Sequence, residues 1–474
     1  MTENTAPKIM NLFLENNIQL SRDALDEILK NEEPFSYSED LLKTSKREGR
    51  LFINLEQLKK GIIKPVIEVI KNFDQTYKIS DVQDMSAYFQ ARLNYFKNNL
   101  QKRLQSVVSI NNAKRAGREE ISLIAIVSGK RTTKSGNVMF SLEDFSGEMR
   151  AIATKEKLIK EADKIVNDDV LGFTGNMSNG IFFINEFTWP DMPIHNNQKT
   201  KGDDATAAFI SDVHIGSREF EAKKFQKMID WINGDLDSHT ELHPHLSEKL
   251  KYIFIAGDLV DGVGVYPGQE DDLIIKDIYK QYKEAAKILE QIPERIKIVI
   301  SPGNHDYVRL AQPQPPVSKE TAPDLYDLPN VDMISNPGLI KAGSGSESTN
   351  ILIYHGTSID KMVMSDPNLK DGYKKPGKVM AALMKRRHLC PLFEGDIMPQ
   401  PNHGDPLVIP EDIDVLHMGH VHSNDIVDYR GVTLINSGTW QAKTSFQEFL
   451  GHEPTPARLP LLNLKTNQIT LTQF

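Results

Sequence analysis

Ser301-Pro302-Gly303-Asn304-His305-Asp306 directly follows a largely apolar run at residues 296–300. The apolar run predicts a buried strand, and the Pro-Gly pair predicts that this strand ends in a tight loop. The loop then presents an amide, an imidazole and a carboxylate next to one another. Because these groups can bind a metal ion or move a proton, we expect chemistry at this stretch.

The same design, an apolar strand that ends in polar side chains, recurs four times in the second half of the chain. The polar ends are Asp212-Val213-His214 after residues 209–211, Gly257-Asp258 after 252–256, His355-Gly356 after 350–354, and Gly419-His420-Val421-His422 after 413–416. A single Gly-Asp or His-Gly pair is usually a turn, and a single buried His is usually a hydrogen-bonded core residue. Five such pieces together favour a two-metal site that hydrolyses phosphate esters, because divalent ions take carboxylate, amide and imidazole ligands.

The residue types predict a role for each of these side chains. Asp258 is expected to bridge two metal ions, because Gly257 lets the backbone turn sharply beside it. The expected ligands of one ion are Asp212, His214 and His422, and those of the other are Asn304, His355 and His420. Asn304 contributes an uncharged oxygen, which limits the negative charge that an approaching phosphate meets. His305 is expected to protonate the leaving oxygen as a general acid.

Composition and charge restrict the class of protein. The 474 residues exceed one ordinary core and predict two or three domains. No apolar run is long enough to cross a bilayer, the first residues are polar and predict no signal peptide, and the one cysteine, Cys390, indicates an intracellular, cytoplasmic protein without intrachain disulfides. The formal net charge of −9 argues against a protein that depends on non-specific DNA affinity, so any nucleic acid must be held by a local patch or by a partner.

The chain predicts four successive regions. Residues 1–75 have helical spacing, with Ser21 as a helix cap, and are expected to form a docking or structural module; 76–118 predict a linker helix. Residues 119–195 contain short β runs, with a hairpin turn at Asn179-Gly180, and predict a small β-barrel. After a polar linker at 195–204, residues 205–474 alternate strands and helices and predict a layered α/β domain. Residues 134–144 resemble the first hairpin of an oligonucleotide-binding fold, a barrel that either stacks single strands on aromatic side chains or only packs against its neighbours.

The motifs Asp-Val-His, Gly-Asp, Gly-Asn-His-Asp, His-Gly and Gly-His-Val-His resemble, in this order, those of the calcineurin-like metallophosphoesterases. Two longer stretches, residues 257–270 and Lys385-Arg386-Arg387-His388-Leu389, are more specific. With the helical start and the expected barrel ahead of the phosphoesterase motifs, the whole chain resembles the small subunits of archaeal DNA polymerase D. This resemblance implies a proofreading 3′-to-5′ exonuclease that acts on DNA with a 3′ end and is bound to a large polymerising subunit. It also implies two divalent ions, manganese or magnesium, with iron or zinc as further options. All the ligand types of the family are present, which favours an active nuclease.

One cluster of basic residues has two interpretations. Lys374, Lys375, Lys378, Lys385, Arg386 and Arg387 surround a predicted helix. They are either a grip on the DNA backbone beside the site or the solvated face of a helix.

Two other functions remain open on sequence grounds. One is a stand-alone metallophosphatase that acts on phosphoproteins or small molecules. The other is a non-catalytic scaffold subunit of the polymerase. The amino-terminal modules argue against the first, and the intact ligand set argues against the second.

Overall fold

The computed structural model describes residues 5–31, 33–47, 52–55, 58, 65–73, 82–117, 119–195, 204–234, 244–343, 348–393 and 404–474. Residues 76–81 of the expected linker helix and 196–203 of the expected polar linker lie outside this set. The chain divides into two compact units, Met1–Lys64 and Pro65–Phe474. Among the described residues, no helix combines the length and the apolar character needed to cross a membrane.

The first unit is mainly helical, as predicted. Its elements are α1 (Thr5–Leu14), β1 (Gln19–Leu20), α2 (Arg22–Ile28), α3 (Pro34–Arg47) and β2 (Phe52–Ile53). Ser21 caps α2, since its side chain accepts a hydrogen bond from the backbone N–H of Ala24. Ile9 and Phe13 of α1 and Ile28 of α2 are fully buried and form the small core of this unit.

The helical unit ends earlier than residue 75, where the sequence placed its boundary. β3 (Ile67–Lys71) belongs to the second unit, because it pairs antiparallel with β13 (Gly338–Ala342) at the edge of a sheet. Val69 and Ile70 of this edge strand are both exposed. The five residues therefore lack the alternation of buried and exposed side chains from which a strand is predicted.

A closed five-stranded barrel follows the linker helix α5 (Val82–Leu100) and α6 (Ile110–Ala113). Its elements are β4 (Glu120–Thr132), β5 (Val138–Asp144), β6 (Gly147–Ala153), α7 (Glu156–Ala162), β7 (Val170–Ser178) and β8 (Ile181–Thr188). The strands close in the order β4-β5-β6-β8-β7, as in an oligonucleotide-binding barrel. Asn179 and Gly180 both have positive φ and form the predicted turn. Phe140, Phe173 and Phe187 pack against one another with ring centroids 5.9–6.2 Å apart, so these aromatic rings fill the barrel core.

The rest of the second unit is built on two six-stranded sheets. The first has the order β12-β11-β10-β9-β18-β19 and consists of β9 (Thr206–Ile210), β10 (Leu250–Ala256), β11 (Lys297–Ser301), β12 (Val331–Met333), β18 (Arg458–Asn463) and β19 (Ile469–Gln473). The second has the order β16-β17-β15-β14-β13-β3 and adds β14 (Thr349–Ile353), β15 (Val415–Met418), β16 (Asn424–Tyr429) and β17 (Val432–Ser437). β9 to β12 are parallel, and so are β14, β15 and β17, so both sheets have strands that end at a common edge.

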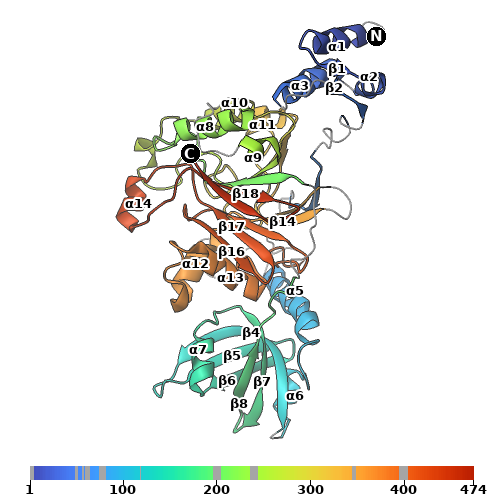
Figure 1. The fold of residues 1–474 in the computed structure, drawn as a ribbon. Coiled ribbons are helices and arrows are strands. Elements are labelled where there is room, and N and C mark those ends of the chain that lie inside the picture. Colours follow the sequence, from blue (N-terminus) through green and yellow to red (C-terminus); the bar gives the residue numbers. More distant parts are fainter. Residues whose placement is uncertain are drawn as a thin grey trace. The chain divides into compact units, whose positions relative to one another are not determined.

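Helices cover the outer face of each sheet, which confirms the predicted layered α/β architecture (Figure 1). The helical elements are α8 (Ala222–Asn233), α9 (Pro244–Glu248), η1 (Gln269–Asp271), α10 (Ile278–Leu289), α11 (Pro323–Tyr326), α12 (Ser358–Ser365), η3 (Pro367–Leu369), α13 (Pro376–Arg386) and α14 (Ser445–Leu450). One apolar cluster joins α8 and α10 to the first sheet, and another joins α12 and α13 to the second. A third cluster, which includes Phe209, Phe254 and Ile353, lies between the two sheets. The central strands of both sheets are thus buried on two faces, which explains their nearly continuous apolar sequences.

Two buried arginines connect α5 and the barrel to the two six-stranded sheets with their helices, which we call the sandwich. Arg92 of α5 donates through Nε to Asp405 Oδ2 (2.7 Å) and through Nη1 to the carbonyl oxygens of Pro391 (2.7 Å) and Asp168 (3.3 Å). Arg386 of α13 forms an ion pair with Asp169 at the start of β7 (3.1 Å). Charged groups so deeply buried are stable only when they are paired, so these contacts hold the barrel to the sandwich.

Candidate metal centre

Every expected ligand follows the carboxyl end of a strand, at the edge where the two facing sheets come together. In the order of β9, β10, β11, β14 and β15, these residues are Asp212 and His214, Asp258, Asn304, His355, and His420 and His422. Ligand sites of open α/β sheets lie at such strand ends. The structure links all seven side chains through successive contacts of 4 Å or less.

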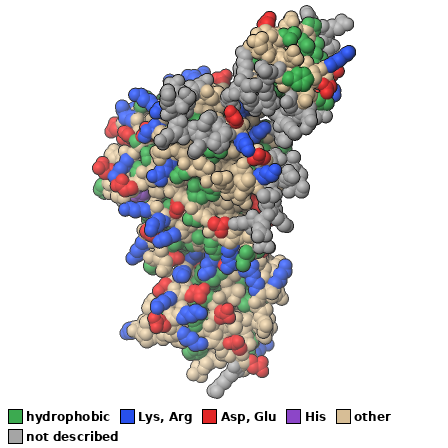
Figure 2. Space-filling model, in the orientation of Figure 1, with side chains coloured by type: hydrophobic (Ala, Val, Ile, Leu, Met, Phe, Trp, Pro, Cys, Tyr) green, Lys and Arg blue, Asp and Glu red, His purple; other side chains and the backbone are tan. Residues whose placement is uncertain are grey.

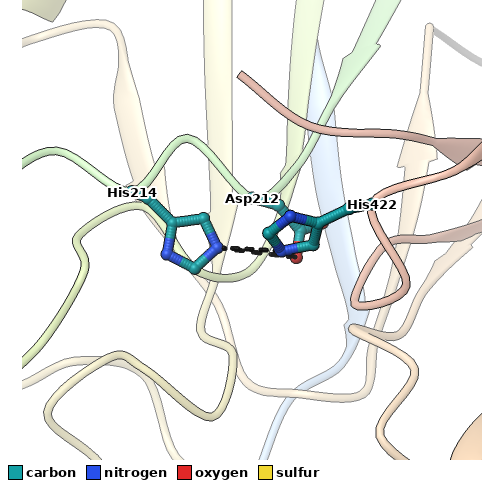
Figure 3. Close-up of side chains that lie close together, drawn as sticks. All are labelled: Asp212, His214 and His422. Atoms are coloured by element: carbon teal, nitrogen blue, oxygen red, sulfur yellow. Dashed lines mark hydrogen bonds and ion pairs between the residues drawn. The ribbon is translucent and has the colours of Figure 1, made fainter. Parts of the chain in front are cut away.

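Asp212, His214 and His422 form the first of two groups. His214 Nε2 lies 3.1 Å from His422 Nε2, which is itself 3.3 Å from Asp212 Oδ1. Figure 3 shows the two rings and the carboxylate pointing toward one another. All three residues are buried. Imidazole nitrogens that face each other at this distance need a proton or a cation between them.

Asn304, His355 and His420 form the second group. Asn304 Oδ1 lies 2.9 Å from His355 Nε2 and 3.1 Å from His420 Nδ1. Asp258 Oδ2 lies 3.2 Å from His355 Nε2 and 3.9 Å from His214 Nε2. Asp258 therefore contacts a histidine of each group, which is the position expected of a bridging ligand.

Two glycines let the loops after β10 and β11 approach each other. Gly257 has φ +82°, and a Cβ there would overlap His355 Nδ1 and lie 2.7 Å from the Cα of Gly303. A Cβ at Gly303 would overlap Asp258 Oδ1 and lie 2.6 Å from its backbone nitrogen. Any larger residue at either position would displace Asp258 or His355.

The backbone at the site is strained. Five of the seven expected ligands have left-handed φ values: Asp212 (50°), His214 (55°), Asp258 (53°), His420 (74°) and His422 (57°). Such conformations cost on the order of 1–3 kcal/mol each for residues with a Cβ, and they cluster at functional sites. All five are Asp or His, which adopt this conformation more readily than most residues with a Cβ.

Two buried carboxylates determine the electrostatics. Burial acts to raise the pKa of Asp258, but His355, His305 and His214 outweigh it and hold this pKa well below its usual range. Burial acts to lower the pKa of His355, but Asp258 and Asp212 outweigh it and raise this pKa to about 10. In the metal-free state at neutral pH, His355 is therefore protonated and balances part of the carboxylate charge.

The donor atoms fit divalent metal ions. Asp212, His214 and His422 each offer an atom within 4.8 Å of the other two, and so do Asp212, Asp258 and His355. Carboxylate and amide oxygens combined with imidazole nitrogens suit several divalent ions. Buried acceptor atoms that converge without a Lys or Arg between them are compensated best by a bound cation.

His305 lies beside both groups and is held by main-chain contacts. Its Nδ1 lies 2.7 Å from the carbonyl oxygen of Asp261, and its backbone N–H donates to Asp258 Oδ1 (2.8 Å). Because a carbonyl oxygen only accepts, Nδ1 carries a hydrogen, and Nε2 is the nitrogen that can exchange a proton. Burial lowers the pKa of His305.

Sequence reasoning assigned no role to several side chains that surround the ligands. Asp261 lies 2.9 Å from His214 Nδ1, and Asp360 Oδ2 lies 2.7 Å from His420 Nε2. The pocket over the site is also lined by Tyr266, Tyr373, Gln441, Thr444, Gln447 and His452. Asp261 comes three residues after Asp258, so its spacing could have identified it. Asp360 belongs to no motif.

The structure corrects the expected DNA grip at Arg386 and Arg387. Both are buried: Arg386 pairs with Asp169, and Arg387 pairs with Glu411 (2.6 Å). Their guanidinium groups hold the fold together and cannot reach a DNA backbone. The sequence could not reveal this, because a buried and a solvated arginine look the same in a charge run.

The four lysines of the same cluster are more accessible. Lys375 and Lys378 are exposed and lie near Asp371 (3.8 and 2.6 Å). Lys385 is half-buried over the ring of Trp189, and Lys374 is exposed next to Tyr373 of the pocket. Figure 2 shows basic and acidic side chains interspersed on the face that it presents, in keeping with such pairing.

Comparisons with known proteins agree with this architecture. Residues 205–424 match the family model described as calcineurin-like phosphoesterase. The DNA polymerase II small subunit of Pyrococcus abyssi is 41% identical over 394 residues, which cover 82% of this chain and 62% of that protein. The chain thus spans less than two thirds of the length of this relative.

The chain covers more than two thirds of the length of two other relatives. The DNA polymerase II small subunit of Methanothermobacter thermautotrophicus is 40% identical over 395 residues, 82% of this chain and 79% of that protein. The protein of the same name from Thermoplasma acidophilum is 32% identical over an alignment of 486 positions, which covers all of this chain and 94% of that protein. The chain therefore belongs to the family of archaeal DNA polymerase II small subunits.

Proposed function

We propose that this chain is the exonuclease subunit of a replicative DNA polymerase and that it removes mismatched nucleotides by hydrolysing DNA phosphodiesters from the 3′ end. The observation that supports this most is Asp258, which contacts a histidine of each of two ligand groups. Within a family of DNA polymerase small subunits, a phosphoesterase site with all seven expected ligands present fits a phosphodiesterase that acts on DNA.

The residues divide the chemistry among them. When bound, two divalent ions would polarise the phosphodiester and stabilise the charge that develops on the attacking and leaving oxygens. Asp212, His214 and His422 would hold one ion and Asn304, His355 and His420 the other, with Asp258 shared between them. His305, whose Nδ1 is bound to the Asp261 carbonyl, would use Nε2 to protonate the leaving oxygen.

A partner subunit fits the charge distribution of the chain. In the described part of the chain, the pocket lining contains no Lys or Arg. The net charge of −9 gives little non-specific attraction to DNA. We therefore propose that a large polymerising subunit delivers the 3′ end, and that Lys374, Lys375, Lys378 and, less directly, Lys385 assist beside the pocket. A pair of manganese ions is our first choice of cofactor, with magnesium, iron or zinc as substitutes.

The test is a cleavage assay with the purified full chain, alone and co-purified with its large subunit. The substrates are 5′-labelled single-stranded DNA in manganese and, in parallel, a generic phosphomonoester. We expect stepwise shortening from the 3′ end, which Asp258→Ala abolishes. Hydrolysis of the monoester without DNA cleavage would instead indicate a stand-alone phosphatase. A non-catalytic scaffold would be indicated if no metal-dependent cleavage occurred. It would also be indicated if the complex with Asp258→Ala cleaved DNA as the wild-type complex does.

A further inference from the structure

The far nitrogen of each candidate histidine ligand has a different partner. We call far nitrogen the ring nitrogen that faces away from the site. In the first group, that of His214 lies 2.9 Å from the Asp261 carboxylate, and that of His422 lies 2.8 Å from the Gln447 amide. In the second group, that of His355 lies 2.8 Å from the Ala256 carbonyl, and that of His420 lies 2.7 Å from the Asp360 carboxylate. Each group thus contains one histidine with a carboxylate behind it. In the second group, that carboxylate is Asp360.

Asp360 determines which nitrogen of His420 faces the site. A carboxylate only accepts hydrogen bonds, so the hydrogen of the imidazole stays on Nε2, toward Asp360. Nδ1 then turns toward Asn304 Oδ1, 3.1 Å away. Two acceptor atoms are thereby directed at the position that a cation would take. Without Asp360, the ring could rotate or carry its hydrogen on Nδ1, and Nδ1 would then no longer be available to bind a metal ion.

The position of His420 makes such support necessary. Its side chain is 16% exposed, against 0% for that of His355 in the same group, so the surrounding core restrains His420 less. Asp360 lies in the first turn of α12, which starts three residues after His355. It comes from a different segment than His420 and can hold the ring independently of the strained loop after β15.

Tyr373 in turn holds Asp360. Tyr373 interacts electrostatically with the Asp360 carboxylate, and its ring packs edge-on against His452, with centroids 4.6 Å apart. Tyr373, Asp360 and His452 all line the pocket. The chain Tyr373–Asp360–His420 therefore connects the pocket wall to the second ligand group.

We propose that Asp360 is a positioning residue that orients His420 toward the second metal position, and that Tyr373 fixes Asp360 for this task. The inference rests on the proposed two-metal function and names a part of it that no motif contains. Partners of this kind behind metal-bound histidines typically change metal affinity by 10- to 100-fold when they are removed.

The test measures manganese binding to the full chain by calorimetry, with electron paramagnetic resonance to detect coupled ion pairs. We expect wild type to bind two ions. Asp360→Ala should bind one ion as wild type does and the other 10- to 100-fold more weakly, and the coupled-pair signal should reappear in excess manganese. Asp360→Asn, which keeps the shape and one acceptor oxygen, should show a smaller loss, and Tyr373→Phe a smaller loss still.

Asp371→Ala is the matched control, because Asp371 is an exposed carboxylate of the same segment that pairs with Lys378. It should bind both ions as wild type does. Wild-type affinity for both ions in Asp360→Ala and Asp360→Asn would overturn the inference, and so would an equal loss of both ions. The outcome is separate from that of the cleavage assay: a wild-type chain that binds two ions but does not cleave DNA would contradict the proposed function and leave the role of Asp360 intact.

Discussion

His355 links the charge of the site to pH. Asp258 and Asp212 raise its pKa to about 10 against the effect of burial. A histidine that binds a metal must be deprotonated, so an ion that binds between about pH 6.5 and pH 10 has to displace the proton of His355. Protons and metal ions therefore compete for His355, and the affinity of the site for metal depends on pH.

We predict that manganese binding releases at least one proton per chain at pH 7.5. Apparent affinity should rise about tenfold per pH unit from pH 7 to pH 9, because one released proton makes binding depend on the first power of proton concentration. Calorimetry in buffers of different ionisation enthalpy measures this release. Binding without proton uptake by the buffer would mean that His355 is already neutral, or that it does not bind the ion.

His305 should matter for chemistry and little for metal binding. Its Nδ1 is used by the Asp261 carbonyl, and its backbone N–H, which a substitution retains, is what contacts Asp258. His305→Ala should therefore bind two manganese ions with near wild-type affinity. It should cleave DNA about 10²- to 10⁴-fold more slowly, the usual loss for a general acid. Loss of an ion in this variant would identify His305 as a ligand instead.

The loops after β10 and β11 depend on each other. Gly303 has no room for a side chain, because a Cβ would overlap Asp258 Oδ1. Gly303→Ala should thus push Asp258 out of the position between the two groups. We expect at least a tenfold loss of manganese affinity, measured by calorimetry, with little change in far-ultraviolet circular dichroism.

Gly117→Ala is the control for this change, because no atom lies within 4 Å of the added Cβ and its φ is ordinary. It should bind manganese as wild type does. Equal binding by both variants would show that the approach of the two loops is not needed for the site.

The elements that carry the site could be predicted from the sequence because each is local. An apolar run followed by Pro-Gly or Gly-Asp predicts a strand and its end, and strand ends of layered α/β domains gather ligands. The side chains behind the ligands were not predictable, because contacts such as Asp360–His420 join segments 60 residues apart. β3 was missed because an exposed edge strand has no apolar alternation. Arg386 and Arg387 were misassigned because burial of a charge depends on tertiary partners such as Asp169.

At the level of the whole second unit, paired charges join the barrel to the sandwich. Arg386 and Asp169 are both almost fully buried, so removing either partner leaves an uncompensated charge. Burial then raises the pKa of Asp169 without the opposing effect of the guanidinium. The junction is therefore a place where one substitution affects the barrel and the phosphoesterase domain together.

We predict that Arg386→Ala lowers the free energy of unfolding by about 3–5 kcal/mol. Lys378→Ala, which breaks the exposed pair with Asp371, should change it by no more than about 1 kcal/mol. Urea denaturation of the full chain, followed by tryptophan fluorescence, measures both. If Arg386→Ala were as stable as wild type but bound DNA more weakly, the structural role assigned to Arg386 would be wrong.

The proposed function depends on seven side chains that hold a pair of cations at the edge where the two sheets come together. Crystals of the full chain grown with manganese, measured by anomalous diffraction at the manganese edge, show whether they do. We predict two anomalous peaks about 3.5–4 Å apart, with Asp258 in contact with both and three of the remaining ligands at each. The absence of peaks among these side chains, or a single peak with Asp258 turned away from it, would contradict the proposed two-metal site.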